Sequence, residues 1–135
     1  LRRLARELGV DARFLGALTD DDLPGLFTGA RAIVVPSRYE GFGLAALEGL
    51  AAGRPTLVAD AGALPEVVGD AGVVLPTDDS QAWADAIRGA ADPGTQSPSD
   101  RRARAAEFTW RRAAERTVAL WRQLAATSAP IAPRS

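Results

Sequence analysis

Residues 32–59 read AIVVPSRYEGFGLAALEGLAAGRPTLVA, and this stretch decides the fold. The continuous apolar run from Ala32 to Val35 is typical of a parallel strand that is covered on both faces. Pro36 ends the run, a loop with two glycines follows, and a helix is predicted from about Leu44 to Ala52. The next strand is expected from Pro55 to Ala59. This order predicts a βαβ unit, in which the two strands are parallel.

The alternation of strands and helices continues on both sides of this unit. Two more strands are predicted, at Arg13 to Leu15 and at Gly72 to Leu75. Helices or helical turns are predicted over residues 1–9, 20–29, 65–68, 79–91, 100–108 and 109–126. The N-cap candidates are Thr19 or Asp20 for the helix over 20–29, and Asp79 or Ser80 for the helix over 79–91. The predicted fold class is α/β, a Rossmann-like parallel sheet with flanking helices. One domain is expected over residues 1–126, followed by a disordered tail over 127–135.

The composition excludes several kinds of chemistry. The 135 residues suffice for one domain and include no Cys and no His, so thiolate catalysis, disulfides and histidine metal ligands are excluded. All 16 basic residues are arginine, and the net charge of −1 gives no general attraction to nucleic acid. No apolar run is long enough for a transmembrane helix, and no signal peptide is recognisable. Because the chain begins with Leu1 and has no Met, we expect it to be part of a longer protein.

The loop after the strand at 32–35 is the strongest candidate site. In open parallel sheets, ligands bind at the carboxyl ends of the strands, which is where Glu40 is expected. Gly41 and Gly43 permit a tight turn and the close approach of a ligand to the backbone. The helix that begins near Leu44 offers free N–H groups and the positive end of its dipole, which suits phosphate or sugar oxygens.

Glu48 lies one helical turn further along the chain. Its face of the helix carries Leu44, Leu47 and Ala51, and this face is predicted to be buried. A carboxylate on a buried face needs a hydrogen-bonding partner, and a vicinal diol could supply one. Paired glutamates and glycines after a strand are also common structural features. The spacing alone therefore leaves a functional and a purely structural interpretation open.

The stretch VVPSRYEGFGLAALEGLAAGRPTLVADAGALPEVVGDAGVVLP resembles the C-terminal nucleotide-sugar-binding domain of retaining GT-B glycosyltransferases, especially glycosyltransferase family 4. The hallmark of that family is a pair of glutamates separated by seven residues, which Glu40 and Glu48 match. The flanking segments FLGALTDDDLPGLFTGARAIVVPS and FTWRRAAERTVALWRQL extend the resemblance to about residues 12–125. The resemblance implies the C-terminal half-domain of a GT-B fold, with the N-terminal part of that domain missing.

The resemblance also implies roles for individual residues. Glu40 would be the catalytic residue that contacts the donor sugar, and Glu48 would hold the ribose hydroxyls. The N–H groups of the glycine loop would bind sugar hydroxyls and the diphosphate, and residues 16–18 would lie beside the base. The residues implied to bind the donor are Gly16, Ala17, Leu18, Ser37, Tyr39, Gly41, Phe42, Gly43, Leu44 and Glu48. Glu66 also matches a recurrent family position, although it could equally cap the helical turn behind Pro65. No metal or other cofactor is implied, and the substrate would be a nucleoside-diphosphate sugar.

The implied activity is transfer of a sugar, of the hexosyl type, to an acceptor with retention of the anomeric configuration, in the biosynthesis of a polysaccharide or glycolipid. Such enzymes hold the diphosphate with an Arg and a Lys from an upstream loop, whereas this chain has no Lys. We therefore expect the fragment to be inactive alone. Two alternatives remain: a non-catalytic module that binds a nucleotide or sugar nucleotide, and a sugar-nucleotide epimerase that shares the domain plan. The retained glutamates favour the transferase.

The expected partners follow from the same resemblance. They are the nucleoside-diphosphate sugar and the missing N-terminal Rossmann domain of the same parent chain, with no nucleic acid. Segment 101–122 is rich in arginine, which indicates either a solvated face, the preferred interpretation, or peripheral membrane contact of the parent. The apolar stripe from Trp110 to Leu124 is expected to cross to the missing domain, so an isolated fragment is expected to be adhesive or to dimerise. A cytoplasmic location is expected from the missing signal peptide and the use of nucleotide sugars.

Overall fold

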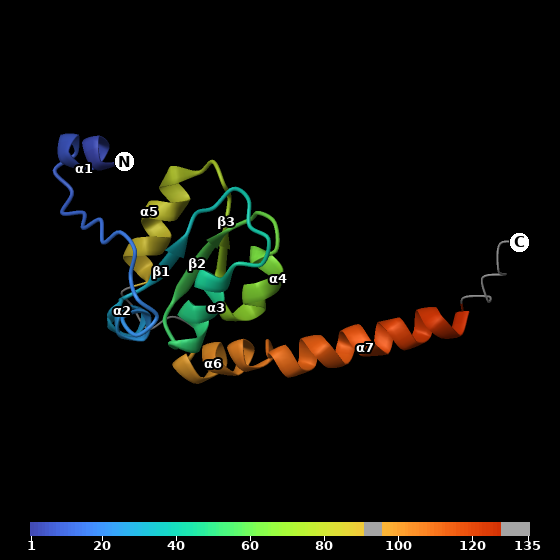
Figure 1. The fold of residues 1–135 in the computed structure, drawn as a ribbon. Helices are drawn as coiled ribbons and strands as arrows, with labels where there is room; N and C mark the ends of the chain where they lie inside the picture. The colour runs from blue at the N-terminus through green and yellow to red at the C-terminus, as the bar shows by residue number, and fades with distance from the viewer. Residues whose placement is uncertain (91–95, 128–135) are drawn as a thin grey trace, which may run out of the picture.

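A parallel sheet of three strands forms the centre of the computed structural model, which describes residues 1–90 and 96–127 (Figure 1). The strands are β1 (Ile33–Val35), β2 (Thr56–Ala59) and β3 (Val73–Leu75), in the order β1-β2-β3. All four residues of β2 are buried, since this strand has a neighbour on each side. The apolar runs therefore correspond to strands, but only the central strand is covered on both faces, as is typical of parallel sheets. In the edge strands β1 and β3 only Val35 and Leu75 are buried, so the expectation that the run at 32–35 is covered on both faces was wrong.

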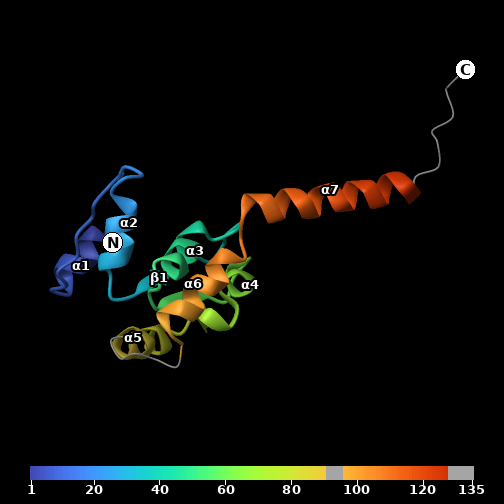
Figure 2. The ribbon, with the colours of Figure 1, turned by 90° about the horizontal axis from the view of Figure 1, so that it is seen from below.

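Seven α-helices and one short 3-10 helix are present in the described residues. They are α1 (Arg2–Glu7), α2 (Leu23–Gly29), α3 (Leu44–Ala51), α4 (Leu64–Val68), η1 (Gly69–Ala71), α5 (Ser80–Gly89), α6 (Pro98–Ala106) and α7 (Trp110–Thr127). Helix α3 connects β1 to β2, and α4 with η1 connects β2 to β3. Helix α6 lies against α3, whereas α5 lies on the opposite side of the sheet (Figure 2). Helices therefore flank both faces of the sheet, which confirms the predicted Rossmann-like α/β class.

Helix α3 approaches the sheet closely at Gly49. A Cβ atom at this position would lie 2.8 Å from Thr56 Oγ1 of β2 and 2.9 Å from Ile33 Cγ1 of β1. The buried residues of the helix are Ala46, Gly49 and Leu50, so small side chains face the strands. Because the helix can lie this close only without a side chain at Gly49, this residue determines which face of α3 is buried.

Helix α6 is attached to the ends of two other helices by arginine side chains. The buried Arg101 donates from Nη1 to the carbonyl of Gly53, just after α3, at 3.4 Å. Arg104 donates from Nε to the carbonyl of Val67 in the last turn of α4, at 3.1 Å. Both interactions satisfy carbonyl groups that a helix end leaves free, and the positive charge suits the negative end of the helix dipole.

The N-terminus of α6 has its own stabilising motif. Ser97 and Asp100 form a capping box, in which each side chain accepts a hydrogen bond from the other residue's backbone N–H. Hydrogen bonds from the Ser97 side chain and backbone lower the pKa of the Asp100 carboxyl. The predicted start of this helix at Asp100 was therefore two residues late, because the cap is Ser97 and Pro98 occupies the first turn.

Three of the four predicted strands are confirmed, and the one at Arg13 to Leu15 was wrong. This segment is exposed and has no regular secondary structure. A strand needs a neighbour for its backbone N–H and C=O groups, and no strand of the described residues pairs with this segment.

The N-cap predictions had mixed outcomes. The cap of α5 is Asp79, whose Oδ1 accepts from the N–H groups of Gln81 and Ala82, as predicted. Neither Thr19 nor Asp20 caps α2, which begins at Leu23 with Asp22 as its N-cap residue and without a side-chain cap. Pro24 explains the later start, since proline is tolerated only in the first turn. The predicted end of α5 at Ala91 lies outside the described residues.

Helix α7 extends away from the sheet in both views (Figures 1 and 2). None of its residues is buried, and the Trp110 side chain is 92% exposed. The helix includes Thr127, the first residue of the predicted tail, and residues 128–135 lie outside the described residues. Among the described helices, none is both long and apolar enough to cross a membrane.

Replacement of Gly49 by alanine tests the close approach of α3 to the sheet. The added methyl group would overlap Thr56 and Ile33, so we expect Gly49→Ala to lower the free energy of unfolding by about 1–3 kcal/mol in urea denaturation. Gly25→Ala in α2 is the matched control, because a Cβ there meets nothing within 4 Å. The control should be neutral or stabilising by up to about 1 kcal/mol. Equal stability of Gly49→Ala and wild type would contradict this account of the packing.

Candidate functional site

The candidate site is the loop from Pro36 to Gly43, which joins the carboxyl end of β1 to α3. Ser37 and Glu40 are half-buried in this loop, whereas the Tyr39 side chain is 89% exposed. The Glu40 carboxylate accepts no hydrogen bond and forms no ion pair within residues 1–90 and 96–127. It is therefore free to accept hydrogen bonds from hydroxyl groups.

Contact with the β2–α4 connection supports the backbone of Glu40. Gly62 has a φ of 55°, and a Cβ atom on it would lie 2.5 Å from the Glu40 carbonyl oxygen. The N–H of Ala63 points to the same oxygen at 3.5 Å. Gly62 was not among the residues predicted from the sequence. Its place three residues after a predicted strand was the available signal, but the sequence does not show that this segment passes so close to Glu40.

Helix α3 begins after a glycine, Gly43, whose backbone is in the left-handed region. Gly43 is the N-cap residue with a φ of 91°, and a Cβ atom on it would lie 2.6 Å from Leu64 Cδ2 at the start of α4. No side chain caps the helix, and its first acceptor, the Gly43 carbonyl, binds the N–H groups of Ala46 and Leu47.

The N–H groups of the last two loop residues and of the first two residues of α3 have no acceptor in the part of the chain that the structure describes. This holds for Phe42, Gly43, Leu44 and Ala45. Together with the helix dipole, four free donors in succession make this turn suited to an anion or to sugar hydroxyls.

Glu48 lies on the exposed face of α3, so the prediction of a buried face was wrong. Leu44 and Ala51 are exposed and Leu47 is half-buried, because the close approach at Gly49 turns the opposite face to the sheet. The carboxylate of Glu48 is thus solvated and has no partner within the described residues. The Glu48 carboxylate therefore needs no buried partner. It lies one helical turn beyond the free N–H groups, on the same side of α3 as Leu44.

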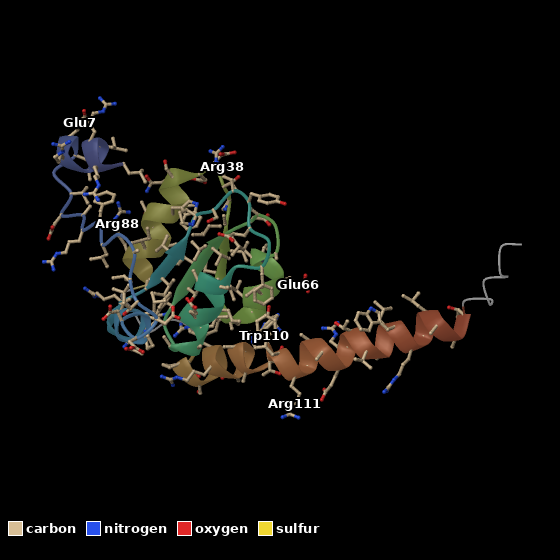
Figure 3. All side chains as sticks on the ribbon, viewed as in Figure 1. Glu7, Arg38, Glu66, Arg88, Trp110 and Arg111 are labelled. Atoms are coloured by element: carbon tan, nitrogen blue, oxygen red, sulfur yellow. The ribbon has the colours of Figure 1, made fainter. Side chains whose placement is uncertain are left out.

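An ion pair spans the same edge of the sheet. Arg38, which follows β1, donates from Nη2 to Asp78 Oδ1, which follows β3, at 2.7 Å (Figure 3). Both side chains are exposed, so the pair contributes at most about 1 kcal/mol to stability. Neither residue was predicted to have a role, although each follows a predicted strand. The pair places a cation at the edge that carries Glu40.

The remaining candidate residues belong to other segments of the chain. Gly16, Ala17 and Leu18 are exposed, follow no strand, and lie in the segment between α1 and α2. The Glu66 side chain is exposed on α4 and points away from the sheet (Figure 3), while its carbonyl accepts from Arg104. No side chain caps α4, so the capping interpretation of Glu66 was wrong.

Comparison with known proteins shows to which family this chain belongs. Residues 1–92 match the family described as Glycosyl transferases group 1. The chain belongs to this family. The D-inositol 3-phosphate glycosyltransferase of Saccharomonospora viridis is 40% identical over 130 residues. The O-antigen chain mannosyltransferase B of Escherichia coli is 38% identical over 115 residues. The match to the first relative covers 91% of this chain and the match to the second covers 83%.

A solved structure supports the same assignment. Sucrose-phosphate synthase from Thermosynechococcus elongatus superposes with a TM-score of 0.79 and 32% sequence identity, over 94% of this chain and 34% of that one. This similarity confirms the fold predicted from the resemblance, a Rossmann-like part of a GT-B glycosyltransferase. The chain spans about 30% of the length of the curated relatives that it matches.

The contact between Gly62 and Glu40 gives a test of how the site loop is supported. Gly62→Ala would combine a strained positive φ with overlap on the Glu40 carbonyl. We expect it to lower the free energy of unfolding by about 2 kcal/mol and to shift the amide resonances of residues 40–44. Gly25→Ala is again the control, since a Cβ at Gly25 meets nothing within 4 Å, its φ is not positive, and it lies outside residues 40–44. If both variants behaved like wild type, Gly62 would not support the loop.

Proposed function

We propose that this chain is the donor-binding part of a retaining glycosyltransferase, which transfers a hexosyl group from a nucleoside-diphosphate sugar to an acceptor. The observation that carries the proposal is the run of free N–H groups from Phe42 to Ala45, with Glu40 before it and Glu48 one turn after it. Membership of the family and the names of the relatives, which are a glycosyltransferase and a mannosyltransferase, support sugar transfer. The proposals of a retaining outcome and of a place in family 4 rest on the resemblance of the two glutamates together with their flanking sequence.

The geometry of the loop and of α3 suits the diphosphate, the ribose and the sugar of the donor. The N–H groups at the start of α3 would receive the diphosphate, because the uncapped helix end is the positive end of its dipole. Glu48 would accept hydrogen bonds from both ribose hydroxyls, as an ionised carboxylate can bind two donors at once. Glu40 would contact the sugar itself, with Ser37 and Tyr39 beside it. Residues 16–18 remain the proposed contact to the base.

The proposed chemistry depends on charge that develops during transfer. Negative charge grows on the leaving diphosphate, and fixed N–H donors aimed at it would lower the barrier. Positive character grows on the sugar, where the carboxylate of Glu40 could balance it. The proposal assigns Glu40 no role as a covalent nucleophile and no step to a metal ion.

We propose that the acceptor and the rest of the donor bind to parts of the parent protein outside this chain. Since the chain spans about 30% of its curated relatives, we propose that transfer requires further parts of such a protein, including an N-terminal Rossmann domain. The nucleotide-sugar donor also leads us to propose a cytoplasmic location. Peripheral membrane contact of the parent through the arginine-rich segment 101–122 remains a proposal of the same kind.

An NMR titration of this chain with UDP, GDP, ADP and dTDP tests the donor-binding proposal. We expect one nucleotide to shift the amide resonances of residues 40–48 selectively. Glu48→Gln should weaken that binding about tenfold or more, because hydrogen bonds to a charged group are worth ~1.5–3 kcal/mol. Glu115→Gln on α7 is the matched control, since it removes the same charge from an exposed helix outside the site.

Two outcomes of this titration would count against the proposal. Shifts confined to other residues would place any nucleotide site elsewhere, and no shift with any of the four nucleotides would leave the free N–H groups without their proposed ligand. The alternative of a non-catalytic binding module predicts the same titration but no sugar transfer. Assay of a longer natural chain that contains these residues, with the selected nucleotide sugar, separates the two.

A further inference from the structure

The aromatic ring of Phe42 connects the site loop to a distant part of the chain. Its centroid lies 5.8 Å from that of Phe108, with the ring planes at 75°, an edge-to-face arrangement. Phe108 lies between α6 and α7, and its N–H donates to the carbonyl of Ala105 at 3.1 Å, so the backbone under the ring is fixed by the last turn of α6. Phe42 is 41% exposed, and the contact with Phe108 covers an edge or face of its ring.

Arg104 fixes Phe108 in turn. Its guanidinium carbon lies 4.9 Å from the centroid of the Phe108 ring, within the range of a cation–π interaction. The same guanidinium donates to the carbonyls of Glu66 and Val67 in α4 and pairs with Glu107. The Arg104 side chain is only 26% exposed. With its nitrogen atoms bound on several sides, the guanidinium is a rigid surface for the ring.

The two supports of the site loop therefore meet on one helix. Gly43 packs on Leu64 at the start of α4, and Arg104 holds the carbonyls at the end of α4. The same arginine packs on the ring of Phe108, and that ring contacts Phe42. On the other side of the loop, Gly41 has open space around it. Because glycines restrict the backbone least, the Phe42 ring is the side chain best placed to limit movement of residues 41–43.

We propose that Phe108 is a positioning residue for the donor site: by holding the Phe42 ring, it orients the free N–H groups of Phe42, Gly43 and Leu44. This inference rests on the proposed function, because those N–H groups are the proposed diphosphate contacts. Phe108 itself touches no donor. The residues before α7 thus act on the site through the loop, although they are more than 60 positions further along the chain.

Leucine substitutions test this inference with little loss of apolar volume. Phe108→Leu should change the chemical shifts of the Gly43 and Leu44 amides. It should also speed the hydrogen exchange of the Ala46 and Leu47 amides, which donate to the Gly43 carbonyl. It should also weaken binding of the nucleotide selected among UDP, GDP, ADP and dTDP roughly twofold to tenfold, the range expected for one aromatic pair. Phe108→Tyr, which keeps the ring, should restore these properties. Trp110→Leu is the matched control, since it removes an aromatic ring two residues away that is 92% exposed.

A double-mutant cycle with Phe42→Leu separates a specific effect of the ring pair from general destabilisation of the chain. If the two rings act as a pair, the Phe42→Leu, Phe108→Leu double variant should bind no more weakly than the worse single variant. Additive losses, unchanged loop amides in Phe108→Leu, or equal effects in Trp110→Leu would each overturn the inference. If no nucleotide binds the wild-type chain, the proposed function fails, while the amide shifts and exchange of the ligand-free chain still decide whether Phe108 positions the loop.

Discussion

The close approach of α3 to the sheet at Gly49 is the constraint on which the rest of the structure depends. A helix can lie this near to β1 and β2 only where no side chain intervenes, since even a Cβ would overlap Thr56 and Ile33. This contact determines the rotation of α3 about its axis. It turns Ala46 and Leu50 inward and leaves Glu48 outward, beside the uncapped N-terminus. Burial of the helix and exposure of the candidate site thus have one physical cause.

A second level of organisation comes from arginine side chains that bind the ends of helices. Arg101 reaches the carbonyl after α3, Arg104 reaches the last carbonyls of α4, and Arg54 donates to the carbonyl of Thr28 in α2. Each arginine places a planar cation where a helix dipole is negative. The Nε atoms of Arg54 and Arg101 are buried without a partner in the described residues, which costs part of this stabilisation. These contacts join segments that lie far apart in the chain.

The candidate site combines rigid support with unused hydrogen-bonding groups. Glycines at 43 and 62 let the loop pack directly against α4 and its preceding turn, and Phe42 adds a contact to the end of α6. Yet the N–H groups at the start of α3 and the carboxylates of Glu40 and Glu48 have no partner in the described residues. Polar groups held in place but left unpaired are the arrangement expected of a preorganised binding site. Family membership agrees with this interpretation, since the relatives are glycosyltransferases.

The sequence by itself determined the βαβ unit around residues 32–59, three of the strands and most helices, because apolar periodicity is a local property. The family followed from the resemblance of Glu40, Glu48 and their flanking segments, which is also read from the sequence alone. The sequence did not determine which face of α3 is buried, since Leu44, Leu47 and Ala51 formed an equally plausible apolar face and only contact with the sheet at Gly49 decided between them. It also predicted a strand at Arg13 to Leu15 that has no neighbour to pair with. The contacts of Gly62 with Glu40 and of Phe108 with Phe42 join residues distant in sequence, so only the tertiary structure decided them.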